Sequence, residues 1–367
     1  MTSPPVSVIV AAYNAEAYID DAVESILQQT LQDFEIIVVN DGSTDGTRTR
    51  LETYETDPRV TVIDQPNAGP AGARNRGFQA SSGRFIAIFD ADDRCNPHRL
   101  SRQVDHLRSR PDLDLVGSYA QVISPDGSPL EVLRVPTTHS EIASRIENSM
   151  QFIHPTIMCR REVFESLGGY NEECRSSEDY EFLRRVVQEY QVGNIPEVLC
   201  DYRIHAESET FRRLEQQKFW GLLTHHGSNS TDKSTDQLLA QIDDQELSID
   251  TLADLGVPRG KIATTLITSY KRRVRLLVSF GNLHGAADFL KKAKDLVTQE
   301  KLGKHQRAEL ALYEVLVNAC NRATFCDGPM TELLTAARTS PTGVLNACRE
   351  WCKFGLHQLY IRIFHTT

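Results

Sequence analysis

The chain has 367 residues, of which 40% are apolar and 25% charged, as expected for a folded protein of one or two domains. Its eight cysteines are scattered without a CxxC pair, which argues against a disulfide framework or a zinc site. Residues 1–260 carry 24 Lys and Arg against 42 Asp and Glu, whereas residues 261–367 carry 16 against 8. The acidic front argues against a nucleic-acid groove, and the basic tail indicates contact with an anionic partner.

The chain shows no membrane-spanning or secretory pattern. No apolar stretch approaches the roughly 20 residues that a bilayer span needs. The N-terminus, MTSPPVSVIV, lacks the basic region and cleavage site of a signal peptide. We therefore expect a cytoplasmic protein, for which the basic tail leaves open a peripheral contact with the inner face of the membrane or with a partner protein.

The first ninety residues alternate between strand and helix patterns. Short runs rich in β-branched side chains predict strands at 6–10, 34–39, 60–63 and 85–89. Between them, helices are expected at 47–54, within NAGPAGARNRGFQAS, and where apolar residues recur at one-sided helical spacing: Ile19, Ala22, Val23, Ile26 and Leu27. This alternation with short connections predicts a parallel, doubly wound sheet.

The pattern is looser from residue 97 onward. We predict helices at 97–109, 139–149 and 161–167, and strands at 113–119 and 152–159. Gly168 and Gly169 close the helix at 161–167, where a left-handed residue is favoured. The run Ser176-Ser177-Glu178-Asp179 opens a further long helix, because a serine cap and first-turn acids stabilise a helix start.

A polar segment, THHGSNSTDKST at 224–235, has no apolar periodicity and is interpreted as a linker. It divides a first domain, 1–223, from a helical C-terminal domain, 236–367, with helices expected at 237–245, 261–280, 286–298, 305–321 and 331–339. The last segment places five apolar residues on one helix face, which packs within the tail or contacts a partner or membrane surface: Leu356, Leu359, Tyr360, Ile363 and Phe364.

The chemistry begins at FIAIFDADD, residues 85–93, where an apolar run ends in Asp90, Asp92 and Asp93. Three acids within four residues repel one another, and oxygen ligands suit Mg²⁺ or Mn²⁺, so the stretch predicts a metal site. The alternative is a turn in which Asp92 or Asp93 caps the following helix. Asp41 ends the second strand as Asp90 ends the fourth, so a parallel sheet would turn both toward one crevice. Alone, Asp41 would be interpreted as a cap for the amides of 42–44.

The loop after the first strand, AAYNAEAY, contains no glycine. A dinucleotide fold needs G-x-G-x-x-G at this place, and no P-loop appears elsewhere, so an NAD or FAD domain is not expected. A nucleotide would instead be held by acids at strand ends. One carboxylate can accept a hydrogen bond from a uracil-type N–H or a ribose hydroxyl, and another can hold a metal that neutralises a diphosphate.

Several motifs together resemble the inverting family 2 glycosyltransferases of the GT-A fold. They are VSVIVAAYNAEAYIDDAVESILQQTLQDFEIIVVNDGSTDGT, NAGPAGARNRGF, FIAIFDADD, HPTIMCRREVFESLGGYNEECRSSEDYEFLRRV and DYRIHAES, over about residues 5–210. The resemblance implies a GT-A-type nucleotide-binding sheet, mixed and mostly parallel, flanked by helices and followed by an all-α region. One departure is Ala11-Ala12, where many members have a proline before Tyr-Asn.

The resemblance also implies the residues that bind the nucleotide sugar. Ala12, Tyr13 and Asn14 would form the loop that meets the base and ribose. Asp41 would accept a hydrogen bond from the base or ribose, and Arg74 would lie beside both.

The remaining implied residues surround the reaction. Asp90 is expected near the ribose and Asp92 on the metal, with Asp93 as the other candidate ligand. Asp179 stands where the family keeps its catalytic base, and the alternative is an acid that only complements the helix dipole. His205 stands where the family often keeps a second metal or pyrophosphate contact, and the alternative is a structural hydrogen bond.

The implied activity is that of a metal-dependent, inverting transferase of the hexosyl or N-acetylhexosaminyl class. It would move a sugar from a nucleotide-diphosphate sugar, most simply a UDP-sugar, to a hydroxyl of a saccharide or lipid-linked acceptor, with Mn²⁺ or Mg²⁺ as cofactor. A nucleotidyltransferase would need a glycine-rich, basic loop that AAYNAEAY lacks. The other alternative is a non-catalytic nucleotide-sugar-binding scaffold with a functional tail, against which the intact acids argue.

Overall fold

The computed structural model describes residues 4–147, 149–174, 177–205, 248–279 and 283–300, with isolated positions between 208 and 222 and between 306 and 317. It divides into two compact units, the first holding the described residues up to 208 and the second those from 214 onward. The predicted linker and its two boundaries lie outside the described residues. So do the helices predicted at 237–245 and 331–339 and the apolar face of 356–364.

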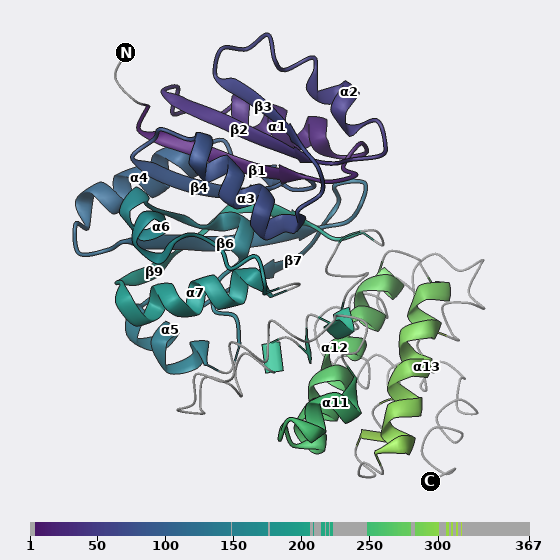
Figure 1. Ribbon diagram of the computed structural model, residues 1–367. Helices are drawn as coiled ribbons and strands as arrows, with labels where there is room; N and C mark the ends of the chain where they lie inside the picture. The colour runs from purple at the N-terminus through teal and green to yellow at the C-terminus, as the bar shows by residue number, and fades with distance from the viewer. Residues whose placement is uncertain are drawn as a thin grey trace, which may run out of the picture. The chain divides into compact units, whose positions relative to one another are not determined.

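A single nine-stranded sheet forms the centre of the first unit (Figure 1), in the order β3-β2-β1-β4-β8-β6-β9-β5 with β7 beside β6. Neighbours within the first four strands run parallel, as do β6 and β9, whereas β8 is antiparallel to both β4 and β6. The sheet is thus mixed and mostly parallel, as predicted. The strands are β1 Val6–Ala12, β2 Phe34–Asp41, β3 Val60–Gln65, β4 Phe85–Asp90, β5 Arg94–Cys95, β6 Leu115–Ile123, β7 Pro129–Leu133, β8 Met158–Arg160 and β9 Val192–Arg203.

Helices cover both faces of this sheet because successive strand residues point to opposite sides. On β4, Phe85, Ala87 and Phe89 pack in the core shared with α1 and α4, whereas Ile86 and Ile88 pack in the core shared with α3, α5, α6 and α7. The helices of the first unit are α1 Ile19–Leu27, α2 Thr47–Leu51, α3 Gly69–Ala80, α4 Arg99–Ser109, α5 His139–Ile146, α6 Arg161–Leu167 and α7 Glu178–Glu189.

Several elements depart from the sequence prediction, which did not include the short strands β5 and β7. The strand expected at 152–159 is instead a 3-10 turn, η1 His154–Thr156, followed by the short β8. The long strand β9 was not predicted, because Gly193, Asn194 and Pro196 interrupt its apolar pattern. The chain accommodates Pro196 by a shift in register, in which Ser118 pairs with Ile195 and Tyr119 with Val198. Proline occurs in sheets at such irregularities.

The helix ends that frame the site were predicted with mixed success. Gly168 ends α6 in the left-handed region, with φ 72°, which confirms the predicted terminator. Ser177 is the N-cap residue of α7, which confirms the predicted helix start, but its side chain makes no capping hydrogen bond. The acids Glu178, Asp179 and Glu181 in the first turn remain to complement the helix dipole.

The second unit is helical in its described part, as predicted. It contains α11 Ile249–Asp254, α12 Arg259–Ser279 and α13 Leu283–Gln299. The last two match the helices expected at 261–280 and 286–298, and a buried apolar stripe along α12 includes Ile262, Leu266, Tyr270 and Leu277. Among the residues described, no helix combines the length and apolar character that a membrane crossing requires.

Candidate functional site

The carboxyl ends of β1, β2 and β4 lie together along one side of the sheet, which is called the carboxyl edge or simply the edge below. Ala11 is in register with Asp90 of β4, and Ala12 with Asn40 of β2. The chain passes from β1 to β2 on one side and returns to β4 on the other, and such a switch point is where ligands bind in open α/β sheets. Asp41 and Asp90 therefore lie at the same edge, as predicted.

The loop after β1 presents an aromatic ring to solvent. Ala12 is buried, whereas Tyr13 is 44% exposed and is the one exposed large apolar side chain in the described part of the chain. Asn14 has a positive φ of 49°. Its N–H donates to Ser43 Oγ at 3.0 Å, and its Oδ1 accepts from the Thr44 N–H at 2.8 Å. Asn14 thus ties this loop to the loop after β2 and leaves the Tyr13 ring free.

Asp41 is buried at 3% exposure and fixes the segment that leads into α3. Its Oδ1 accepts from the Ala68 N–H at 2.8 Å and from Gln65 Nε2 at 2.7 Å. It does not cap the turn that follows it, because the Ser43 N–H donates to Asn40 Oδ1 instead. Its second oxygen accepts no hydrogen bond from the described residues and is available to a ligand.

Arg74 is buried on α3 and reaches Asp90 at the carboxyl end of β4. It donates from Nη2 to Asp90 Oδ1 at 3.2 Å and from Nη1 to Glu178 Oε1 at 2.8 Å. The guanidinium also lies over the Tyr170 ring, 5.6 Å from its centroid. Burial raises the pKa of Asp90, and the positive charge of Arg74 opposes that rise.

Asp92 and His205 converge at the same edge. Asp92 Oδ2 lies 2.9 Å from His205 Nε2, and the two side chains are 28% and 12% exposed. His205 Nδ1 is buried without a hydrogen-bond partner among the described residues. In that part of the chain, no group of three or more His, Cys, Asp and Glu side chains forms a complete metal-ligand set. These two residues therefore offer a carboxylate and an imidazole, and the other ligands of an ion would come from elsewhere.

Asp93 points into the interior of the fold, toward β9. It is fully buried, with its Oδ1 accepting from the Arg203 N–H at 2.8 Å and its Oδ2 lying 4.0 Å from Cys200 Sγ. Burial, with the nearby charges of Asp92 and Asp90, raises its pKa well above the usual value. Asp93 therefore anchors β9 from the inside of the fold.

Arg203, which sequence reasoning missed, is a buried junction of the site. It donates from Nε to the Asp92 carbonyl at 2.8 Å, from Nη1 to the Pro125 carbonyl at 2.8 Å, and from Nη2 to Asp21 Oδ2 at 2.7 Å. Its guanidinium also lies 4.7 Å from the centroid of the Tyr18 ring. The available signal was a basic residue between apolar ones two positions before His205, in DYRIH.

Asp179 stands at the first turn of α7. Its Oδ1 accepts from the Tyr180 N–H at 2.7 Å. Burial is the largest cause that raises its pKa to about 7, Glu178 adds a like charge, and Arg74 opposes both. A carboxylate that titrates near the working pH is suited to accept a proton in a reaction. Glu178, also missed from the sequence, could have been found from its place beside Asp179 in SSED.

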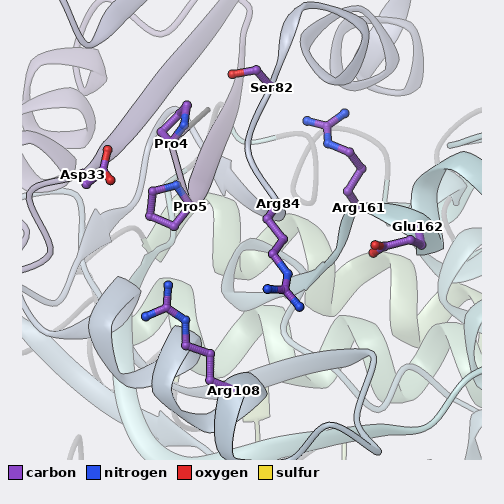
Figure 2. Close-up of a pocket in the computed structure, with 8 residues that line it drawn as sticks. All are labelled: Pro4, Pro5, Asp33, Ser82, Arg84, Arg108, Arg161 and Glu162. Atoms are coloured by element: carbon purple, nitrogen blue, oxygen red, sulfur yellow. The ribbon is translucent and has the colours of Figure 1, made fainter. Parts of the chain in front are cut away.

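A separate pocket of about 410 Å³ lies at the opposite, amino-terminal ends of the strands (Figure 2). Its lining includes Arg84, Arg108 and Arg161 together with the acids Asp33 and Glu162. Arg161 is already engaged, since its guanidinium donates to the Gly83 carbonyl and to Ser81 Oγ. The pocket shares no residue with the carboxyl edge that carries Asp41, Asp90 and Asp92. We therefore assign donor binding and transfer to that edge.

Known proteins resemble this chain in sequence and in fold. The model of glycosyl transferase family 2 matches residues 7–168. An uncharacterized glycosyltransferase of Haemophilus influenzae is 36% identical over 58% of this chain and 73% of its own length. Another, of Methanocaldococcus jannaschii, is 31% identical over 61% of this chain and 79% of its own.

A solved structure shares the fold. TarS 1-349 of S. aureus, crystallised with UDP, superposes with a TM-score of 0.51 at 16% identity over 95% of this chain and 91% of that one. The fold is thus that of the GT-A glycosyltransferases, and on the sequence relatives the chain belongs to glycosyltransferase family 2.

Proposed function

We propose that this protein is an inverting glycosyltransferase that moves a sugar from a nucleoside-diphosphate sugar to a hydroxyl of a saccharide or lipid-linked acceptor. The observation that carries the proposal is Asp179, a carboxylate whose pKa is raised to about 7 and which is joined to the donor edge through Glu178, Arg74 and Asp90. A single base with no matching nucleophile agrees with one displacement and inversion.

The donor site would be formed by the carboxyl ends of the first strands. The exposed Tyr13 ring offers a face on which a base can stack, and the free oxygen of Asp41 offers an acceptor for a base N–H or a ribose hydroxyl. Ala12 and Asn14 would shape this loop, and Asp90, paired with Arg74, would lie near the ribose. UDP-sugars are our first choice of donor, supported by the UDP in the similarly folded TarS.

Asp92 and His205 fit a divalent cation, Mn²⁺ or Mg²⁺. A carboxylate and an imidazole 2.9 Å apart at an open edge are ligands that Mn²⁺ accepts. An ion held by these two residues would take its other ligands from the diphosphate of the donor and from water. When bound, the ion would supply charge neutralisation for the leaving diphosphate. Asp92 is favoured over Asp93, because the Asp93 oxygens face Arg203 and Cys200 in the interior.

Asp179 would act as the general base. An acceptor hydroxyl has a pKa far above 7, so the hydroxyl must lose its proton as it attacks the anomeric carbon. The deprotonated Asp179 accepts that proton, the new glycosidic bond forms, and the bond to the nucleoside diphosphate breaks on the opposite side. Such a base typically contributes about 10² to 10⁴-fold to the rate.

Calorimetric titration of UDP with and without Mn²⁺ tests the proposal. We expect UDP to bind at least tenfold more tightly with Mn²⁺, and Asp92→Asn to remove most of that gain. Asp105→Asn, which changes an exposed acid on α4, serves as the control and should bind like the wild type. If the wild type bound UDP equally well with and without Mn²⁺, the proposal of a metal-dependent donor site would be contradicted.

A further inference from the structure

Arg74 and Glu178 form a buried charged connection between two parts of the site. Arg74 on α3 contacts both Asp90 at the end of β4 and Glu178 at the start of α7. Arg74 and Glu178 are each only 7% exposed. One guanidinium therefore joins the strand that carries the donor-side acid to the helix turn that carries Asp179.

The charged groups around Asp179 come from several elements. Glu178 precedes it on α7, the charges of Arg74 on α3 and Asp90 on β4 also act on it, and Tyr170 lies against Arg74. Burial raises the pKa of Tyr170 well above its usual value, so this ring is neutral at working pH. The charges that act on Asp179 are thus two like charges, Glu178 and Asp90, and one opposite charge, Arg74.

We propose that Glu178 and Arg74 are positioning residues for Asp179, which fix the first turn of α7 against β4 and so hold the Asp179 carboxylate at the donor edge. The inference rests on the proposed function for the role of Asp179, and on the contacts above for the way in which Asp179 is held. Glu178 acts through its neighbour and does not itself touch the reacting atoms.

The burial of this pair supports a positioning role over a purely stabilising one. Removing two charges from water costs several kcal/mol per ion, and well-packed apolar residues often serve stability equally well. Misplacing a reacting group by about 1 Å can cost about 10²-fold in rate. A rigid, forked contact from Arg74 to two carboxylates is the kind of support that such placement needs.

Another acid in the first turn of α7 offers a matched comparison. Glu181 pairs with Arg185 at 2.6 Å, with the two side chains 16% and 27% exposed. Arg185 also donates to the Leu167 and Gly169 carbonyls, so this pair joins α7 to the end of α6. It has the same chemistry on the same helix but does not contact Asp90. Glu181→Gln is therefore the control for Glu178→Gln.

Two substitutions separate the charge of Glu178 from its length. Glu178→Gln keeps an oxygen that can accept from Arg74 but removes the negative charge. Glu178→Asp keeps the charge but withdraws it by one methylene group, which breaks the contact with Arg74. If the pair positions Asp179, the first substitution should change mainly the pKa of Asp179, and the second mainly the rate of transfer.

The pKa of Asp179 can be measured without any activity, by carbon NMR titration of protein labelled with [γ-13C]aspartate. The Asp179 signal is assigned by its absence from Asp179→Asn. We expect Glu178→Gln to lower the pKa of Asp179 by about 1 unit or more, since a like charge is lost, and Glu181→Gln to leave it unchanged. An unchanged pKa in Glu178→Gln would show that Glu178 does not act on Asp179 and would overturn the proposal.

The kinetic arm uses transfer or donor hydrolysis measured across pH. In Glu178→Gln, we expect kcat to begin rising at a lower pH, by the same amount as the pKa measured by NMR. The maximal kcat reached at high pH should stay within about threefold of the wild-type value. Glu178→Asp should lower the plateau about tenfold or more, with UDP affinity unchanged. A wild-type plateau in Glu178→Asp would overturn positioning. If the wild type showed no transfer at all, the proposed function would fail, whereas the NMR titration would still decide whether Glu178 acts on Asp179.

Discussion

Three carboxylates of the site have raised pKa values, and their partners give them different roles. Asp93 is fully buried against Arg203 and Cys200 and supports the fold. Asp90 is held by the Arg74 guanidinium. Asp179 is partly exposed, and its pKa of about 7 leaves it poised between its two protonation states. Asp90 is partly exposed too, but its carboxylate is paired with Arg74, so Asp179 is the acid of the three that can exchange a proton with a bound acceptor.

Replacement of Asp179 by asparagine tests this assignment. Because a base must be deprotonated to accept a proton, wild-type transfer should rise with pH through about 7 and level off above it. Asp179→Asn should lower kcat about 10² to 10⁴-fold and abolish that limb. UDP affinity, measured by calorimetry, should stay the same. Loss of UDP binding in this variant would place Asp179 in the donor pocket instead.

At residue scale, the sequence predicted the positions of site residues that are fixed by strand direction. Asp41 and Asp90 end parallel strands, so their shared edge follows from the pattern alone. The partners of Arg74 do not follow, because Glu178 lies 104 positions away and only packing brings them together. The different roles of Asp92 and Asp93 do not follow from the sequence either, because they depend on the packing of β9 against Asp93.

Among the elements, β9 contributes most to the site and was least visible in the sequence. Its interrupted pattern hides a strand that pairs with both β6 and β5. Cys200 and Arg203 on this strand contact Asp93, and His205 follows directly after its end. The parallel strands β1 to β4 were predictable because their runs are short, apolar and uninterrupted. A strand that carries Gly, Asn and Pro is defined instead by its neighbours.

Arg203 provides the test of this element. A lysine at 203 keeps the charge, but its single ammonium cannot reach the acceptors at Asp92, Pro125 and Asp21 together. Loss of two hydrogen bonds to a buried charge should lower the free energy of unfolding by about 3 kcal/mol, measured by urea denaturation.

The matched control for Arg203→Lys is Arg102→Lys, which alters an exposed pair with Glu197. We expect this control to leave the urea midpoint unchanged, because exposed ion pairs contribute little. Arg203→Lys should also weaken the effect of Mn²⁺ on UDP binding, since the Asp92 backbone loses its tether. Equal urea midpoints for the two variants would show that Arg203 is not the junction described above.

On the scale of the whole chain, the two units meet in sequence near residue 213. Leu214, Phe219 and Leu222 are buried at 4%, 5% and 7% exposure and belong to the second unit, where Glu215 pairs with Lys292 of α13 at 2.6 Å. The polar composition of 224–235 led us to predict a domain that ends at 223. We propose instead that the first unit can fold without the chain after residue 213, because the described apolar residues between 214 and 222 are buried with the second unit.

Two shortened chains distinguish these boundaries. A chain that ends at 223 would expose Leu214, Phe219 and Leu222, each of which costs about 1.5 to 3 kcal/mol in lost burial. We expect it to bind an apolar dye and to self-associate in light scattering. A chain that ends at 213 should remain monodisperse and keep the metal-dependent binding of UDP, because every candidate site residue lies before it. Cooperative unfolding of the longer chain combined with failure of the shorter one to fold would restore the boundary at 223.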